Sequence, residues 1–295
     1  MGLAMLVQLS LNGLALGLLY ALPAFGIALI YNATGLFNYS QGDLLTLGGY
    51  LMLTVFGVWH LPYPIAVLVV LGATLALGYA MGSIYFFPML IQKFGPSVIL
   101  IGTVALSVAI VNAVLLLWGP MAKSYENVFG NKAFQFGDMY IMPHVFWIFG
   151  IVAVLVILLQ YLFTKTITGL AMRAVAQNYV AAQLMGIKVN QIIPLTIALS
   201  TVLAAISGIL ITPIQPLTPQ LGGLLATKAF ASVLIGGMGS MSGALVGGAI
   251  VGISETLIAT LVTPTYKDVF TFLVVVSFLL FRPGGIFRRI EVEKV

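Results

Sequence analysis

The chain has 295 residues, of which 61% are hydrophobic and only 6% are charged, and its mean hydropathy is +1.15. Soluble domains carry roughly a quarter charged residues, so a chain this apolar could not cover its surface in water and is an integral membrane protein. The net charge of +5 does not indicate a nucleic-acid partner because the cations are scattered at the ends of apolar blocks, and the absence of Cys excludes disulfides and thiolate metal sites.

The apolar blocks predict a series of membrane spans, since about 20 apolar residues make one helical span. In chain order these are 6–31, 36–58, 62–82, 96–118, 141–163 and 192–214, then a broken pair at 222–238 and 242–262, and a last span at 267–281. The predicted fold class is all-α: a polytopic transmembrane helical bundle of about eight spans plus a broken or re-entrant helix. It forms a single domain over 1–295.

Polar residues interrupt the start of the second predicted span, where Asn38, Ser40, Gln41 and Asp43 surround Gly42. An unwound stretch beside a glycine is typical of a segment that lines a translocation path. Equally, the same residues are typical of a capped cytoplasmic helix start, with Asn38 or Ser40 accepting a bond from a free N–H of the first turn. Both interpretations remain open.

The longest polar interruption, 164–191, contains Lys165, Arg173 and Lys188 but no acidic residue. Asn178 is a good helix N-cap, residues 179–185 form about two turns, and Gly186 can end a helix in the left-handed conformation. A short capped helix in a basic loop indicates either a surface for a cytoplasmic partner or a linker that happens to be helical. The other long loop, 119–140, is a docking surface or, as its composition favours, a solvated loop.

Glycine is abundant, with 32 residues, and four pairs have the GxxxG spacing that lets membrane helices approach closely. These pairs are Gly13/Gly17, Gly78/Gly82, Gly243/Gly247 and Gly248/Gly252. The run of Gly236, Gly237, Gly239 and Ser240 should break a helix, and irregular backbone at membrane depth survives only where it is buried or lines a wet cavity. This run is therefore a candidate lining of a path.

Glu255 lies among apolar and small residues of the span 242–262, where a carboxylate is costly. It is either a path residue, a buried hydrogen-bond anchor, or a residue that faces the outer interface or pairs with a Thr or Ser of another helix. The last interpretation is slightly favoured.

Basic residues concentrate on the cytoplasmic side of membrane proteins, and this rule orients the chain. With the 164–191 loop inside, eight Lys and Arg fall inside and four outside, and the N-terminus lies outside. The inside residues are Lys93, Lys165, Arg173, Lys188, Arg282, Arg288, Arg289 and Lys294. The outside residues are Lys123, Lys132, Lys228 and Lys267.

No sequence motif for chemistry is present: there is no Walker A sequence, no His-Glu-x-x-His, no nucleophile elbow and no paired acidic motif. We therefore expect no enzymatic activity, cofactor or metal site. Transport driven by a separate ATPase fits these residues, and a self-sufficient carrier or a channel fits them nearly as well.

Three stretches together resemble one family, the LivH-type permeases of branched-chain amino acid ABC importers, and they span most of the chain. In 17–52 the matching positions are Asn38, Ser40, Gln41, Gly42, Asp43, Gly49 and Tyr50. In 169–210 they are Gly169, Arg173, Ala174, Ala181, Ala182, Gly186, Ile187, Ala204, Ala205 and Gly208. In 230–257 and 266–287 they are Gly236, Gly237, Gly239, Ser240, Gly243, Gly247, Gly248, Gly252, Glu255, Pro283 and Gly285. Gln41 departs from the pattern, because many members have His there.

The resemblance implies a permease subunit in the bacterial or archaeal cytoplasmic (inner) membrane. Its implied partners are a LivM-like second permease or another copy of itself, two ATP-binding subunits, and an extracytoplasmic substrate-binding protein. Residues 178–187 are then the coupling helix that an ATP-binding subunit holds. The residues expected to serve this coupling are Arg173, Asn178, Ala181, Ala182, Gly186 and Ile187. The residues expected along the translocation path are Asn38, Gln41, Asp43, Gly236, Gly237, Gly239, Ser240 and Glu255.

The implied substrate is a branched-chain or related amino acid, and relatives in this family also carry urea or short amides. An alternative from another class is an ion- or proton-coupled carrier, which would require Asp43 or Glu255. An intramembrane enzyme is disfavoured because no catalytic constellation appears.

Overall fold

The computed structural model describes residues 3–92, 94–126, 128, 130, 132–136 and 139–287. The predictions for Lys93, Arg288, Arg289 and Lys294 lie outside the described residues. The first half of the chain forms α1 (Leu3–Thr34), α2 (Gln41–Met52), η1 (Leu53–Val58), α3 (Tyr63–Met81), η2 (Gly82–Phe86), α4 (Phe87–Ile91), α5 (Pro96–Trp118) and the strands β1 (Phe134–Phe136) and β2 (Met139–Ile141). The second half forms α6 (Pro143–Lys165), α7 (Ile167–Gln177), α8 (Tyr179–Leu184), α9 (Val189–Ile211), α10 (Leu221–Gly236), α11 (Met241–Leu261) and α12 (Lys267–Phe281).

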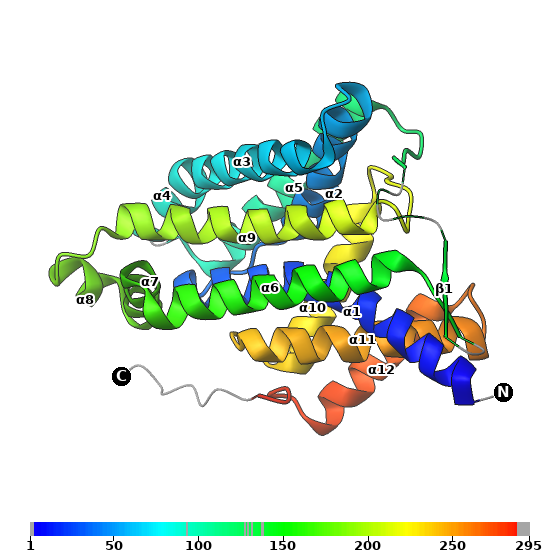
Figure 1. Ribbon diagram of the computed structural model, residues 1–295. Coiled ribbons are helices and arrows are strands. Elements are labelled where there is room, and N and C mark those ends of the chain that lie inside the picture. Colours follow the sequence, from blue (N-terminus) through cyan, green and yellow to red (C-terminus); the bar gives the residue numbers. More distant parts are fainter. Residues whose placement is uncertain are drawn as a thin grey trace.

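The all-α class is confirmed, with one short antiparallel hairpin of β1 and β2 at one end of the bundle (Figure 1). Six of the described helices are long and apolar enough to cross a membrane, judged by length and composition. They are Ala4–Thr34, Tyr63–Ile91, Ser97–Trp118, Pro143–Lys165, Val189–Ile211 and Met241–Leu261. The other three predicted spans are shorter helices: α2 continued by η1, α10 with 16 residues, and α12 with 15 residues.

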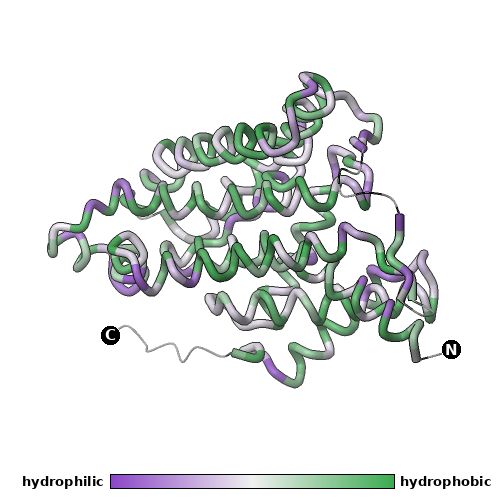
Figure 2. Tube along the Cα trace, in the orientation of Figure 1, coloured by the Kyte–Doolittle hydropathy of each residue, from purple (hydrophilic) through white to green (hydrophobic). Residues whose placement is uncertain are grey.

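The centre of the bundle is formed by α1 and α9, whose apolar windows are 83% and 78% buried. In contrast, α3, α5 and α6 bury less than a third of theirs, so they form the lipid-facing periphery. Figure 2 shows apolar residues along these helices and hydrophilic residues gathered at the two ends of the bundle. This distribution is what a bilayer around the middle of the bundle requires.

Glycines bring α1 and α11 into backbone contact. A β-carbon on Gly17 would overlap the carbonyl oxygen of Gly248, and one on Gly13 would lie 2.8 Å from the Cα atom of Ile253. The pairs that contain Gly78 and Gly243 also lie at contacts with other backbone segments or small side chains. The interpretation of the GxxxG pairs as helix-contact positions is therefore confirmed.

The loops that the distribution of Lys and Arg assigned to opposite sides of the membrane lie at opposite ends of the bundle. Gln8 of α1 donates a hydrogen bond to the carbonyl of Tyr140 at 2.8 Å, so the start of α1 lies beside the 119–140 loop. The helices α7 and α8 lie at the opposite end (Figure 1). The chain after α12 also returns to that opposite end, where the amide of Phe287 donates to the carbonyl of Gly236 at 3.0 Å.

Candidate functional site

The predicted short helix in the 164–191 loop is present as α8. The Asn178 side chain accepts hydrogen bonds from the amides of Val180 and Ala181, both at 3.0 Å. After the helix, Gly186 has a φ of +87° and the amide of Ile187 donates to the carbonyl of Ala182 at 3.0 Å. The cap, the two turns and the glycine stop are thus confirmed as local structure, with the helix ending one residue earlier than predicted.

The helix α7, which occupies most of the segment before α8, was not predicted from the sequence. Its signals were Thr166, whose hydroxyl accepts a bond from the Gly169 amide at 3.1 Å, and a buried stripe at Gly169, Met172 and Val175. Arg173, expected to serve coupling, lies on α7 and is exposed. Consequently α7 leads into α8 through Asn178 alone, and the short stretch 185–188 joins α8 to α9.

The end formed by α7 and α8 exposes apolar side chains. Ala182 is buried and anchors α8, while Ala181 is exposed. Leu184 and Met185 are each 84% exposed. The exposed large apolar side chains of this end are Ile167, Leu170, Val180, Leu184 and Met185. An apolar patch beside polar residues is typical of a surface that contacts another protein or the membrane.

The polar run of the second predicted span lies halfway through the bundle, and the helix α2 begins there at Gln41. The Gln41 side chain donates to the carbonyl of Ser200 at 2.9 Å, and Ser200 is the midpoint of α9. The amide of Tyr39 bonds the Thr103 hydroxyl at 3.3 Å. The interpretation as a cytoplasmic helix start is therefore wrong: residues 36–40 are non-helical backbone at mid-depth, buried in protein as such backbone must be.

The Asn38 side chain forms hydrogen bonds with the residues that follow it in this non-helical segment. Its side-chain oxygen accepts bonds from the Ser40 amide at 3.1 Å and from the Ser40 hydroxyl at 2.7 Å, and its amide faces Gln41. All three residues are fully buried. Neither Asn38 nor Ser40 caps the helix with its side chain, while the amide of Asp43 in the first turn bonds its own carboxylate.

The start of α10 meets the start of α2 at this depth. A β-carbon on Gly42 would overlap the carbonyl oxygen of Gly222, and one on Gly222 would lie 2.7 Å from a carboxylate oxygen of Asp43. Asp43 is buried and also hydrogen-bonded by Ser107 of α5. The α10 start likewise lacks a side-chain cap. Two half-length helices therefore join N-terminus to N-terminus in the middle of the bundle, with one carboxylate between them; we call this the α2–α10 junction.

The glycine run before α11 is a turn at the α7 end, away from the α2–α10 junction. Gly237 and Gly239 have φ values of +102° and +78°, which favour glycine. Asn32 donates to the carbonyl of Gly239 at 2.6 Å, and Ser240 caps α11 by accepting from the Gly243 amide at 3.0 Å. Gly236 is in backbone contact with Gly243. This turn thus has a structural explanation at each position.

Glu255 belongs to an ionic cluster inside the bundle. It accepts from Lys228 of α10 at 2.6 Å and lies 3.1 Å from the ammonium of Lys267, while Lys228 also lies 3.0 Å from Asp268. The Lys228 ammonium stands 5.3 Å from the centre of the Tyr20 ring. The slightly favoured interpretation, an outer-interface residue or a partner of Thr or Ser, is wrong. The placement of Lys228 among the outside cations is also wrong, because it is buried in α10 to pair with Glu255.

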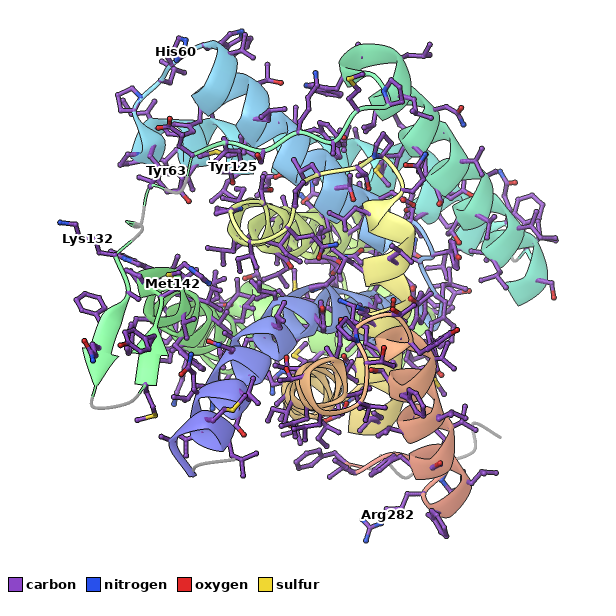
Figure 3. All side chains as sticks on the ribbon, turned by 90° about the vertical axis from the view of Figure 1, so that its right-hand side faces the viewer. His60, Tyr63, Tyr125, Lys132, Met142 and Arg282 are labelled. Carbon is purple, nitrogen blue, oxygen red and sulfur yellow. The ribbon has the colours of Figure 1, made fainter. Side chains whose placement is uncertain are left out.

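The 119–140 loop is partly packed onto the bundle. Tyr125 donates to the carbonyl of Ile209 at 2.6 Å, and burial raises the pKa of its phenol. Figure 3, which looks onto this end, shows Tyr125 next to Tyr63, with His60 at the same corner. A cavity of about 760 Å³ lies between this loop and the residues around His60.

The predicted site residues thus lie in four places, one of which is α8 and its two ends, with Asn178, Ala181, Ala182, Gly186 and Ile187. Asn38, Gln41 and Asp43 meet at the α2–α10 junction, and Glu255 lies in the ionic cluster. Gly239, Ser240 and Arg173 line one cavity of about 730 Å³ at the α7 end, a combination that sequence spacing could not reveal. Among the described residues, no group of three or more His, Asp or Glu side chains could hold a metal ion.

The sequence matches the family described as "Branched-chain amino acid transport system / permease component" over residues 9–279. It is 32% identical to the high-affinity branched-chain amino acid transport system permease protein BraD of Pseudomonas aeruginosa, covering 98% of both chains. It is 30% identical to the LivH protein of Escherichia coli K12 with the same description, covering 98% of this chain and 97% of that protein. PsaBC from Streptococcus pneumoniae in complex with Fab superimposes with a TM-score of 0.48 and 15% identity, over 92% of this chain and 89% of that one.

Proposed function

Because the chain belongs to the family of permease components of branched-chain amino acid transport systems, we propose that it is the membrane-spanning subunit of an ABC importer for these or related amino acids. As a permease it moves a solute and catalyses no reaction itself. ATP is hydrolysed by separate subunits, since the sequence has no Walker A motif.

The observation that carries this proposal is α8. A two-turn helix, capped at Asn178 and stopped at Gly186, is held between α7 and α9 and exposes Leu184 and Met185. A helix built in this way can fit a groove of an ATP-binding subunit, as amphipathic helices do in peptide recognition. The proposed coupling residues are Arg173, Asn178, Ala181, Ala182, Gly186 and Ile187.

The α7–α8 end then faces the cytoplasm and the start of α1 faces outward. The proposed assembly contains two permease subunits, this chain with a LivM-like subunit or with a second copy of itself. It also contains two ATP-binding subunits and a substrate-binding protein that docks on the outer end. The membrane is the cytoplasmic membrane of a bacterium or archaeon.

The proposed path passes the α2–α10 junction. Discontinuous helices that end at mid-depth present free backbone groups to a substrate in many transporters. Here the junction offers Asn38, Gln41 and Asp43 beside two helix starts whose N-cap residues make no side-chain cap bond. The glycine turn at Gly236, Gly237, Gly239 and Ser240 packs the end of α10 against the start of α11 at the cytoplasmic end of the bundle, beside the path. Glu255 of α11 holds α10 in place through its ion pair with Lys228.

An ion-coupled carrier is less well supported, because a coupling carboxylate must be able to exchange its partner and Glu255 is fixed by two lysines. A urea or short-amide importer of the same family is the nearest alternative in substrate.

Uptake into proteoliposomes tests the proposal. With both ATP-binding subunits, ATP and the binding protein, we expect uptake of leucine, isoleucine or valine. Uptake that persists without the ATP-binding subunits, or that follows an ion gradient, would refute it. Uptake of urea but not of amino acids would change the substrate and keep the ABC assignment.

A further inference from the structure

We infer that the cavity between α7 and the turn before α11 binds the headgroup of an anionic phospholipid. The cavity measures about 730 Å³ and is bounded by α1, α6, α7, α9 and the Gly239–Ser242 turn. Its walls therefore come from segments far apart in the chain, and a ligand there would join them.

Within the described part of the chain, the cavity lining carries one positive charge and no negative one. Arg173 lines it, and among the described residues no Asp or Glu does. The ion pairs of the described residues involve Lys228 and Lys267, so none neutralises Arg173. An arginine fork is suited to a phosphate because it can donate two parallel bonds. Ser242, Gln177 and Asn32 add polar groups around it.

The remaining wall is apolar, formed by side chains such as Leu29, Phe163, Met172 and Met241. A ligand with an anionic head and an apolar body matches this combination. A free amino acid matches it less well, because its ammonium group would find no carboxylate. Basic pockets between transmembrane helices on the cytoplasmic side are typical sites for anionic lipid headgroups.

The position in the bundle supports a lipid. The helix α7 is amphipathic, with Met172 and Val175 buried and Arg173, Ile167 and Leu170 exposed. The exposed Ile167 and Leu170 beside a cation suit the boundary between lipid headgroups and acyl chains. The assignment to the inner leaflet rests on the proposed function, which places α7 at the cytoplasmic end. The presence of an anion site does not depend on the proposed function.

A lipid bound here would tie α7 to α1 and to the start of α11. Since α7 continues directly into α8, with Asn178 between them, the lipid would stiffen the connection between α8 and the centre of the bundle. We therefore expect anionic lipid to stabilise the protein and to raise the coupling of ATP hydrolysis to uptake.

Lipid titration of the purified transporter tests the inference without a transport assay. The thermal unfolding of the complete complex and its lipid adducts in native mass spectrometry are followed as phosphatidylglycerol is added to phosphatidylcholine. The variants are Arg173→Gln, Arg173→Lys and Lys165→Gln. Lys165 is exposed at the end of α6 and lies outside the cavity lining. Lys165→Gln therefore removes one positive charge, as Arg173→Gln does, but away from the cavity.

We expect Arg173→Gln to weaken phosphatidylglycerol binding by about fivefold to tenfold, as loss of one such cation implies. Arg173→Lys should retain part of the binding, and Lys165→Gln should leave it unchanged. Equal binding by Arg173→Gln and the wild type, or equal weakening by both Gln variants, would overturn the inference. Inorganic phosphate that binds the cavity as tightly as phosphatidylglycerol does would also overturn the inference, because the site would then take a free anion.

If Arg173→Gln does not yield folded protein, Arg173→Lys and Lys165→Gln decide the matter through their relative affinities. Failure of uptake without loss of lipid binding would contradict the proposed function and leave this site in place. Absence of specific phosphatidylglycerol binding by the wild-type complex, with intact ATP-driven uptake, would overturn the site and leave the proposed function in place.

Discussion

Gly186 ends α8 with a φ of +87°, and Gly119 ends α5 at the other end of the bundle with a φ of +81°. A β-carbon added at either position would have no heavy atom within 4 Å, so an alanine would meet strain but no clash. Left-handed backbone costs a residue with a β-carbon about 1 kcal/mol or more. Gly119 also has a ψ of 176°, a combination that essentially only glycine adopts, so both positions strain an alanine without a clash.

We expect Gly186→Ala to shift the exit of α8 and to lower the solute transported per ATP hydrolysed severalfold, with the protein still folded. The ratio is measured in proteoliposomes that contain the complete transporter. Gly119→Ala is the control and should leave the ratio unchanged. Equal ratios in both variants and the wild type would contradict a coupling role for α8.

Glu255 offers a second test at the scale of single residues. Its replacement by Gln leaves Lys228 with Asp268 alone and leaves Lys267 without its partner. Breaking a buried ion pair typically costs 3–5 kcal/mol, and we expect about 3 kcal/mol here because Asp268 remains. Thermal unfolding in one detergent measures the loss.

Lys267→Gln is the matched variant, since its side chain is 39% exposed and exposed pairs contribute about 1 kcal/mol or less. A destabilisation by Lys267→Gln as large as that by Glu255→Gln would show that the cluster is not anchored by the buried Lys228–Glu255 pair.

At the scale of elements, the α2–α10 junction depends on Gly42. A methyl group there would overlap the Gly222 carbonyl oxygen, and backbone cannot give way as a flexible side chain can. We expect Gly42→Ala to force the two half-helices apart, to cost about 1–3 kcal/mol as overpacking does, and to lower uptake. Unfolding and uptake are measured on the same preparation.

Gly72 on α3 provides the comparison, because a β-carbon there meets no atom within 4 Å. Gly72→Ala should be close to neutral in both measurements. Wild-type stability and uptake in Gly42→Ala would mean that the junction opens freely or does not lie on the path.

Some features of these helices could be predicted from the sequence and others could not. Span centres, the α8 cap and the close-contact glycines follow from hydropathy, capping chemistry and spacing, which are local properties. The start of α2 at Gln41 and the ion pair of Glu255 with Lys228 are not local, because each is decided by a partner far along the chain. The helix α7 was missed because its apolar stripe is short and its Thr166 cap lies close to the preceding span.

At the scale of the molecule, the two ends differ in what they expose. One end carries the loop packed by Tyr125 and the start of α1, and the other carries α7, α8 and the cavity that contains Arg173. Between them, α2 and α10 each reach only from the middle to one end. A permease that alternates between outward- and inward-facing arrangements needs such a break, because a closed junction can part while the long helices stay intact.

The central claim is that α8 is held by an ATP-binding subunit, and the chain allows a direct measurement because it has no native Cys. A photoactivatable cross-linker is attached to a single introduced thiol of this chain before the ATP-binding subunits are added, at Leu184→Cys on α8 or at Met121→Cys in the 119–140 loop. The wild-type side chains are 84% and 77% exposed, so both thiols are reachable. We predict a cross-link to the ATP-binding subunit from Leu184→Cys and none from Met121→Cys. No such cross-link from Leu184→Cys, or one from Met121→Cys instead, would contradict the account.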